Sequence, residues 1–98
     1  MANESASFVP VMAITDIIRD RLSALSPDSM ELLDESGQHI GHDGAKDGGG
    51  HYQLIIVAQV FANLPLQARH RMIYETLGGL MQKEIHALAI KAYAPDEI

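Results

Sequence analysis

The sequence predicts an α+β domain in which helices pack on one face of a small three-stranded mixed sheet. An amphipathic helical segment comes first, and two strand-like segments then flank a glycine-rich stretch. A second helical segment and a final strand complete the chain. Its 98 residues are enough to build one small hydrophobic core, so we expect a single domain.

The first helix is predicted from about Val11 to Leu25, because apolar residues recur there at helical spacing. Pro27 disfavours helical geometry at Ser26, so the helix should end before this point. Residues Met30 to Asp34 then read as a short strand.

The segment HYQLIIVAQVF, which begins at His51, is apolar at successive positions and predicts a central strand. A helix follows from about Leu66, and Gly78 and Gly79 break or bend it, because each glycine costs about 1 kcal/mol inside a helix. The last strand lies in EIHALAIKAYAP. The predicted order is therefore αββααβ.

Composition excludes several classes of protein. The chain has no cysteine, which removes disulfides and thiolate metal ligands together. No apolar run approaches the ~18–20 residues that span a bilayer, and MANESASFVP lacks the features of a signal peptide. We therefore expect no membrane association and a cytoplasmic location. The net charge of −6 argues against tight non-specific binding to DNA.

The stretch HIGHDGAKDGGGHY, residues 39–52, concentrates three histidines and five glycines between the first two strands. The third strand returns after a helical crossover, so it should run parallel to the central strand. Its start would then lie at the same end of the sheet as the glycine-rich stretch. This topology brings His86 towards His39, His42 and His51.

Each of these histidines, and also His70 in the second predicted helix, has a purely structural interpretation. His39 and His42 are compatible with an exposed polar loop, and His51 and His70 with packing in a strand and a helix. His86 is compatible with packing beside Leu88 and Ile90, since residues two apart share a strand face.

Neutral imidazole is a good ligand for zinc, copper, nickel and iron. A structural zinc site usually takes four protein ligands, and an iron–sulfur cluster needs thiolates that histidine replaces only in part. Because the chain has no cysteine, the histidines predict half a site that another molecule completes.

Neither a phosphate site nor an active site is predicted. GAKDGGG lacks the GxxxxGK[ST] spacing of a phosphate-binding loop. Asp34, Glu35, Ser36 and His39 resemble a nucleophilic set only in composition, because no strained elbow or cofactor motif frames them. A plain polar strand end explains the three residues at positions 34–36 better, and we expect a protein that is not an enzyme.

The segments MELLDESGQH, GGGHYQLIIV, ARHRMIYETL and EIHALAIKAY closely resemble the BolA family, and the likeness runs from about Ile14 to Pro95. The resemblance implies a domain similar to the type II KH fold, without the GxxG loop that grips nucleic acid in true KH domains. It also implies partnership with a monothiol glutaredoxin around a shared [2Fe–2S] cluster, with glutathione. The isolated chain should carry no cluster and should be a monomer or weak homodimer.

The resemblance also implies roles for particular residues. The family's histidine at the start of the last strand matches His86, its loop histidine matches His39, and His42 is a nearby competitor. Many relatives begin near Met12. We therefore expect residues 1–11 to form a flexible N-terminal extension and residues 12–98 to form the BolA-like domain.

Family members are also described as transcriptional regulators, which makes DNA a second candidate partner. Val60 stands where relatives are often basic, and Asn63 where a glycine is usual, although asparagine can still adopt the left-handed conformation. The remaining candidates for a surface that binds a partner or nucleic acid are Arg69, His70, Arg71 and Lys83. The alternative interpretation of this surface is a solvated helix face that docks an acidic partner.

Overall fold

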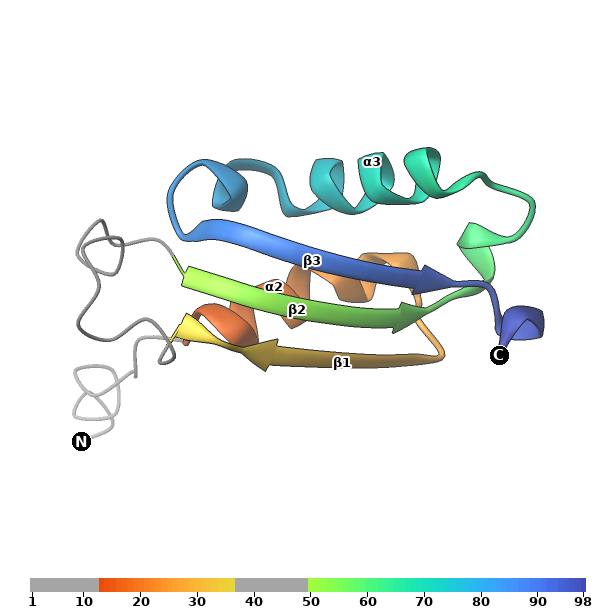
Figure 1. Ribbon diagram of the computed structural model, residues 1–98, viewed down its shortest axis with the longest axis horizontal. Coiled ribbons are helices and arrows are strands. Elements are labelled where there is room, and N and C mark those ends of the chain that lie inside the picture. The colour runs from red at the N-terminus through yellow and green to blue at the C-terminus, as the bar shows by residue number, and fades with distance from the viewer. Residues whose placement is uncertain (1–12, 37–49) are drawn as a thin grey trace, which may run out of the picture.

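The computed structural model describes residues 13–36 and 50–98 (Figure 1). Its helices and strands are α2 (Ile14–Leu22), β1 (Ser29–Asp34), β2 (Gly50–Val57), α3 (Leu66–Leu77) and β3 (Ile85–Tyr93). Four short 3-10 helices accompany them within the described residues: η1 (Ser23–Leu25), η4 (Gln59–Phe61), η5 (Gly78–Gln82) and η6 (Pro95–Glu97). The α+β class is confirmed, with η5 in the place of the second of the two adjacent helices. The predicted extension, residues 1–11, lies outside the described residues.

The sheet has the order β1-β2-β3, so β2 is the central strand as predicted. β1 pairs with β2 in antiparallel fashion, and β3 pairs with β2 in parallel. Parallel neighbours cannot be joined by a tight turn, and here α3 and η5 form the connection that returns the chain to the start of β3 (Figure 1). The starts of β2 and β3 therefore lie at the same end of the sheet.

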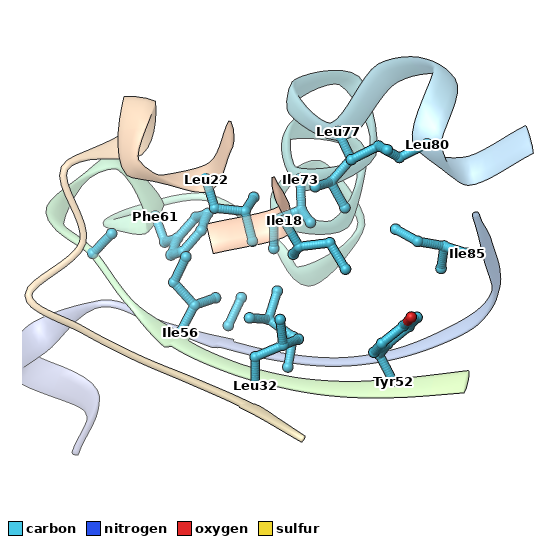
Figure 2. Close-up of a cluster of buried hydrophobic side chains, with 13 residues drawn as sticks. Ile18, Leu22, Leu32, Tyr52, Ile56, Phe61, Ile73, Leu77, Leu80 and Ile85 are labelled. Carbon is cyan, nitrogen blue, oxygen red and sulfur yellow. The ribbon is translucent and has the colours of Figure 1, made fainter. Parts of the chain in front are cut away.

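The hydrophobic core lies between the two α-helices and one face of the sheet (Figure 2). Ile18 and Leu22 of α2 and Ile73 and Leu77 of α3 are fully buried in it. Along β2, every second side chain points into this core, namely those of Tyr52, Leu54 and Ile56. The side chains at the alternate positions are half-buried and face the other side of the sheet. They are those of His51, Gln53 and Ile55.

The predicted breaks in the helices have clear conformational causes. The first helix turns from α to 3-10 geometry after Leu22 and ends at Leu25, and Ser26 is left-handed with φ 51°. α3 ends at Leu77, and the residue that caps it, Gly78, has a φ of +58°, which favours glycine. Asn63 adopts the left-handed conformation with φ 66°, as the sequence allowed.

α2 and α3 are also tied together at the end of α3. Arg21 of α2 donates a hydrogen bond from Nη1 to the carbonyl oxygen of Leu77, at 2.9 Å. Carbonyl groups of the last turn of a helix have no partner within the helix, so this bond satisfies one of them. Among the described residues, no helix has the length and apolar character needed to cross a membrane.

Gly50, the first residue of β2, is buried directly against the ring of Tyr52. A Cβ atom at position 50 would lie 2.5 Å from Cε2 and 2.6 Å from Cζ of Tyr52, and would also contact its hydroxyl oxygen. The ring itself is 6% exposed and belongs to the core. Glycine is therefore required here because Tyr52 occupies the space of a side chain.

We expect Gly50→Ala to destabilise the fold by about 1–3 kcal/mol, the usual cost of forcing an extra group into a packed site. Urea unfolding followed by circular dichroism measures this change. Gly79→Ala is the matched control, because a Cβ at position 79 meets nothing within 4 Å. Equal unfolding midpoints for the two variants would contradict the close packing of Tyr52 on Gly50.

Candidate histidine site

His51 and His86 form a stacked pair at the end of the sheet where β2 and β3 begin. Their ring centroids are 5.1 Å apart and the ring planes are inclined by 26°. His86 is exposed, whereas His51 is half-buried. The parallel pairing of the two strands thus brings His86 to His51, as the predicted topology required.

An irregularity in the β2–β3 register directs His86 out of the core. Gly50 is opposite Ile85, but His51 is opposite Ala87, so His86 is an extra residue on β3 with no partner on β2. Such bulges re-aim side chains and are common next to functional sites. Ile85 is 2% exposed and lies in the core, while His86 next to it is exposed.

Strict alternation of side chains predicts that His86 packs beside Leu88 and Ile90. This prediction is wrong because of the bulge. Leu88 and Ile90 pack against the core, and alternation would place His86 on the same face. The bulge interrupts the alternation between His86 and Leu88.

On the side of β2 that faces β1, the backbone of His51 is hydrogen-bonded to residues that follow β1. The backbone N–H of His51 donates to the hydroxyl oxygen of Ser36 at 2.9 Å, and the N–H of Glu35 donates to the carbonyl oxygen of His51 at 2.8 Å. Asp34 in turn accepts the N–H of Ser36 at 2.9 Å. These three polar residues organise the end of the strand through hydrogen bonds, whereas His39, the fourth member of the set considered in the sequence, lies outside the described residues.

Tyr52 lies on the core side of the same end of the sheet. Burial raises the pKa of the Tyr52 phenol, and the negative charge of Asp34 raises it further, whereas a hydrogen bond with Ser36 opposes both effects. The phenol is therefore neutral at physiological pH, and its role is to pack over Gly50.

The predicted ligands His39 and His42 lie outside the described residues. They belong to residues 37–49, which connect Ser36, two residues after β1, with Gly50, the first residue of β2. Within residues 13–36 and 50–98, no group of three or more histidine or carboxylate side chains is arranged to hold a metal ion. At this end of the sheet the described residues bring together two imidazoles, those of His51 and His86.

Arg69, a predicted member of the partner surface, is buried at the other end of the sheet. It is 5% exposed, and its Nε donates to the carbonyl oxygen of Leu64 at 2.8 Å. Nη1 donates to the carbonyl oxygen of Ala92 at 2.9 Å, and the two Nη atoms bind the carboxylate of Glu97 at 2.6 and 2.7 Å. The prediction that Arg69 forms part of an exposed basic surface is therefore wrong.

The remaining members of this predicted surface do not form one patch around Arg69. His70 is half-buried and Arg71 is exposed in the first half of α3. Lys83 is exposed after η5, three residues before His86, and so lies near the start of β3.

Residues 22–97 match the family model described as BolA-like protein. The chain belongs to the BolA-like family.

Relatives of this BolA-like chain have different names and lengths. It is 34% identical to the DNA-binding transcriptional regulator BolA of Vibrio cholerae, over 86% of this chain and 77% of that protein. It is 38% identical to SufE-like protein 1 of Arabidopsis thaliana, over 83% of this chain but only 24% of that protein.

Solved BolA structures have the same fold. BolA1 from Arabidopsis thaliana superposes with a TM-score of 0.77 at 30% identity, covering 91% of this chain and 99% of that one. The BolA domain of SufE1 from the same plant gives a TM-score of 0.76 at 36% identity, covering 91% of this chain and 100% of the domain.

The BolA-like chain also has a strongly perturbed carboxyl group, at Glu97. The guanidinium of Arg69 and the N–H of Ala94 donate hydrogen bonds to it, and together they lower its pKa from 4.5 to about 2. A carboxyl group with a lowered pKa stabilises the fold above its ordinary pKa, and this stabilisation is lost as the pH falls towards the lowered value.

We therefore expect Glu97→Gln to reduce stability at neutral pH. The difference in urea midpoint between wild type and variant should be largest above about pH 5 and should become small near pH 2, because below pH 4.5 the unfolded carboxyl is protonated while the native carboxylate stays ionised until about pH 2. Glu75→Gln, the same substitution at an exposed carboxylate on α3, is the control. If the difference in urea midpoint between wild type and Glu97→Gln does not change with pH, the pairing of Arg69 with Glu97 is contradicted.

Proposed function

We propose that this BolA-like protein is a non-catalytic adaptor that pairs with a monothiol glutaredoxin and co-ligates a [2Fe–2S] cluster through histidines, in iron–sulfur cluster trafficking or in iron and redox regulation. The observation that carries the proposal is the exposed His86, which a bulge turns away from the core at the end of the sheet where residues 37–49 attach. Family membership supports it.

The donor chemistry of the chain fits a shared cluster. The sequence has no cysteine, so thiolates must come from the glutaredoxin and its glutathione, while imidazole can replace part of a thiolate set. His86 and one loop histidine, His39 or His42, are the residues of this chain that would hold the cluster. A bound cluster would supply electron-transfer or cluster-transfer chemistry, and the chain would supply ligands and a docking surface.

We expect His86→Ala to abolish the change in visible circular dichroism that appears when the chain is mixed with a cluster-loaded monothiol glutaredoxin. Imidazole ligands shift the spectrum of a cluster away from that of an all-thiolate site, and the variant removes the imidazole fixed on β3. Lys91→Ala is the control, because Lys91 is exposed on the same strand but lies away from its start. The chain alone should show no cluster absorption. An unchanged spectrum with His86→Ala would contradict the proposal.

We expect single substitutions of His39 or His42 to have partial effects, because each imidazole can substitute for the other. The double variant His39→Ala/His42→Ala should lose the spectral change. The same glutaredoxin titration measures it. Full retention in the double variant would exclude both loop histidines as ligands.

DNA binding is the alternative function, and the name of the Vibrio cholerae relative favours it. Of the cations in the predicted surface, Arg71 and Lys83 are exposed, whereas Arg69 is buried. Binding driven by phosphate contacts weakens by orders of magnitude between about 50 and 200 mM salt, whereas cluster co-ligation does not depend on phosphate contacts. Salt-dependent DNA binding that Arg71→Ala abolishes, with no response to the glutaredoxin, would favour this alternative.

A further inference from the structure

The stacked pair contains a histidine that the proposed cluster site does not use. His51 lies on the face of the sheet away from the helices, and its ring lies against that of His86. The two residues come from different strands and are 35 positions apart in the sequence (86 − 51). Their contact is therefore a product of the parallel pairing of β2 with β3.

His51 is the more firmly held of the two residues. Its backbone is bonded on both sides, to Glu35 and Ser36 after β1 and in register with Ala87 of β3. His86 is exposed and has no opposite residue on β2, so strand pairing alone does not fix the direction of its side chain. The ring of His51 provides a side-chain contact for His86, which the backbone pairing of β2 with β3 does not provide.

We propose that His51 is a positioning residue for His86: its ring holds the His86 imidazole in one orientation before the partner arrives. This inference rests on the proposed function, because it concerns how the cluster ligand is presented. A ligand that is already ordered does not lose side-chain freedom on binding, which raises affinity without adding a contact to the partner.

The role requires a flat ring at position 51 and requires no nitrogen that binds metal. Aromatic rings stack through their faces, so phenylalanine can replace the ring of His51 in the stack but cannot replace it as a ligand. The variants His51→Ala and His51→Phe therefore separate a positioning role from a ligand role. Gln53→Ala is a matched control, because Gln53 is half-buried on the same face of the same strand.

The first measurement uses the isolated chain. The imidazole proton resonances of His86, assigned by comparison with His86→Ala, report the ring current of a neighbouring ring. We expect His51→Ala to shift them and to weaken their cross-relaxation with position 51, whereas His51→Phe should preserve a stacked-ring signature. Gln53→Ala should leave them unchanged. Thermal unfolding of each variant shows whether the fold is retained.

The second measurement is the visible circular dichroism titration with cluster-loaded monothiol glutaredoxin. We expect His51→Ala to weaken the mixed complex by about two- to tenfold, the range that fixing one side chain is worth in binding, and to alter the cluster spectrum. His51→Phe should restore both affinity and spectrum.

Each contrary result has a distinct meaning. If His51→Ala leaves the His86 resonances or the titration unchanged while His86→Ala abolishes the complex, the positioning role is wrong and the proposed function stands. If His51→Phe keeps the stack but loses the complex, His51 is itself a ligand and the inference is overturned. If His86→Ala does not affect the complex, the proposed function fails and the positioning role fails with it.

Discussion

The parallel pairing of β2 with β3 is the constraint on which the rest of this structure depends. Parallel neighbours require a long crossover, and the chain uses it to place α3 over the core face of the sheet. The same pairing sets Ile85 beside Gly50, so that the last strand begins where residues 37–49 end. The core and the histidine pair therefore have a common topological origin.

The two ends of the sheet differ in how their charged and polar side chains are placed. At the end of β3, Arg69 joins the turn before α3, the last strand and the C-terminal 3-10 helix through bonds to Leu64, Ala92 and Glu97. Buried guanidinium groups are tolerated when their donors are satisfied in this way. At the start of β3 the side chain of His86 is exposed. A buried, fully bonded guanidinium thus lies at one end of the sheet and an exposed imidazole at the other.

The histidine end combines close packing with an exposed imidazole. Tyr52 covers Gly50 on the core side, while His51 and His86 stack where the bulge interrupts the register. The bulge turns the side chain of His86 outwards, while Tyr52 remains packed on Gly50 at the edge of the core. This arrangement is compatible with the proposed function, in which this chain would offer imidazole and a partner would supply the thiolates.

Local sequence patterns by themselves determined the elements and their order. Helical spacing located α2, the Gly78–Gly79 pair ended α3, and the apolar run that begins at His51 identified β2 as the central strand. These features depend on residues close in the chain, where periodicity and backbone preference act directly. Only tertiary structure decided the burial of Arg69, because its acceptors are carbonyl and carboxylate groups as far as 28 residues away. It also decided the outward turn of His86, because a bulge is a property of how two strands align and leaves no periodic signal in either strand.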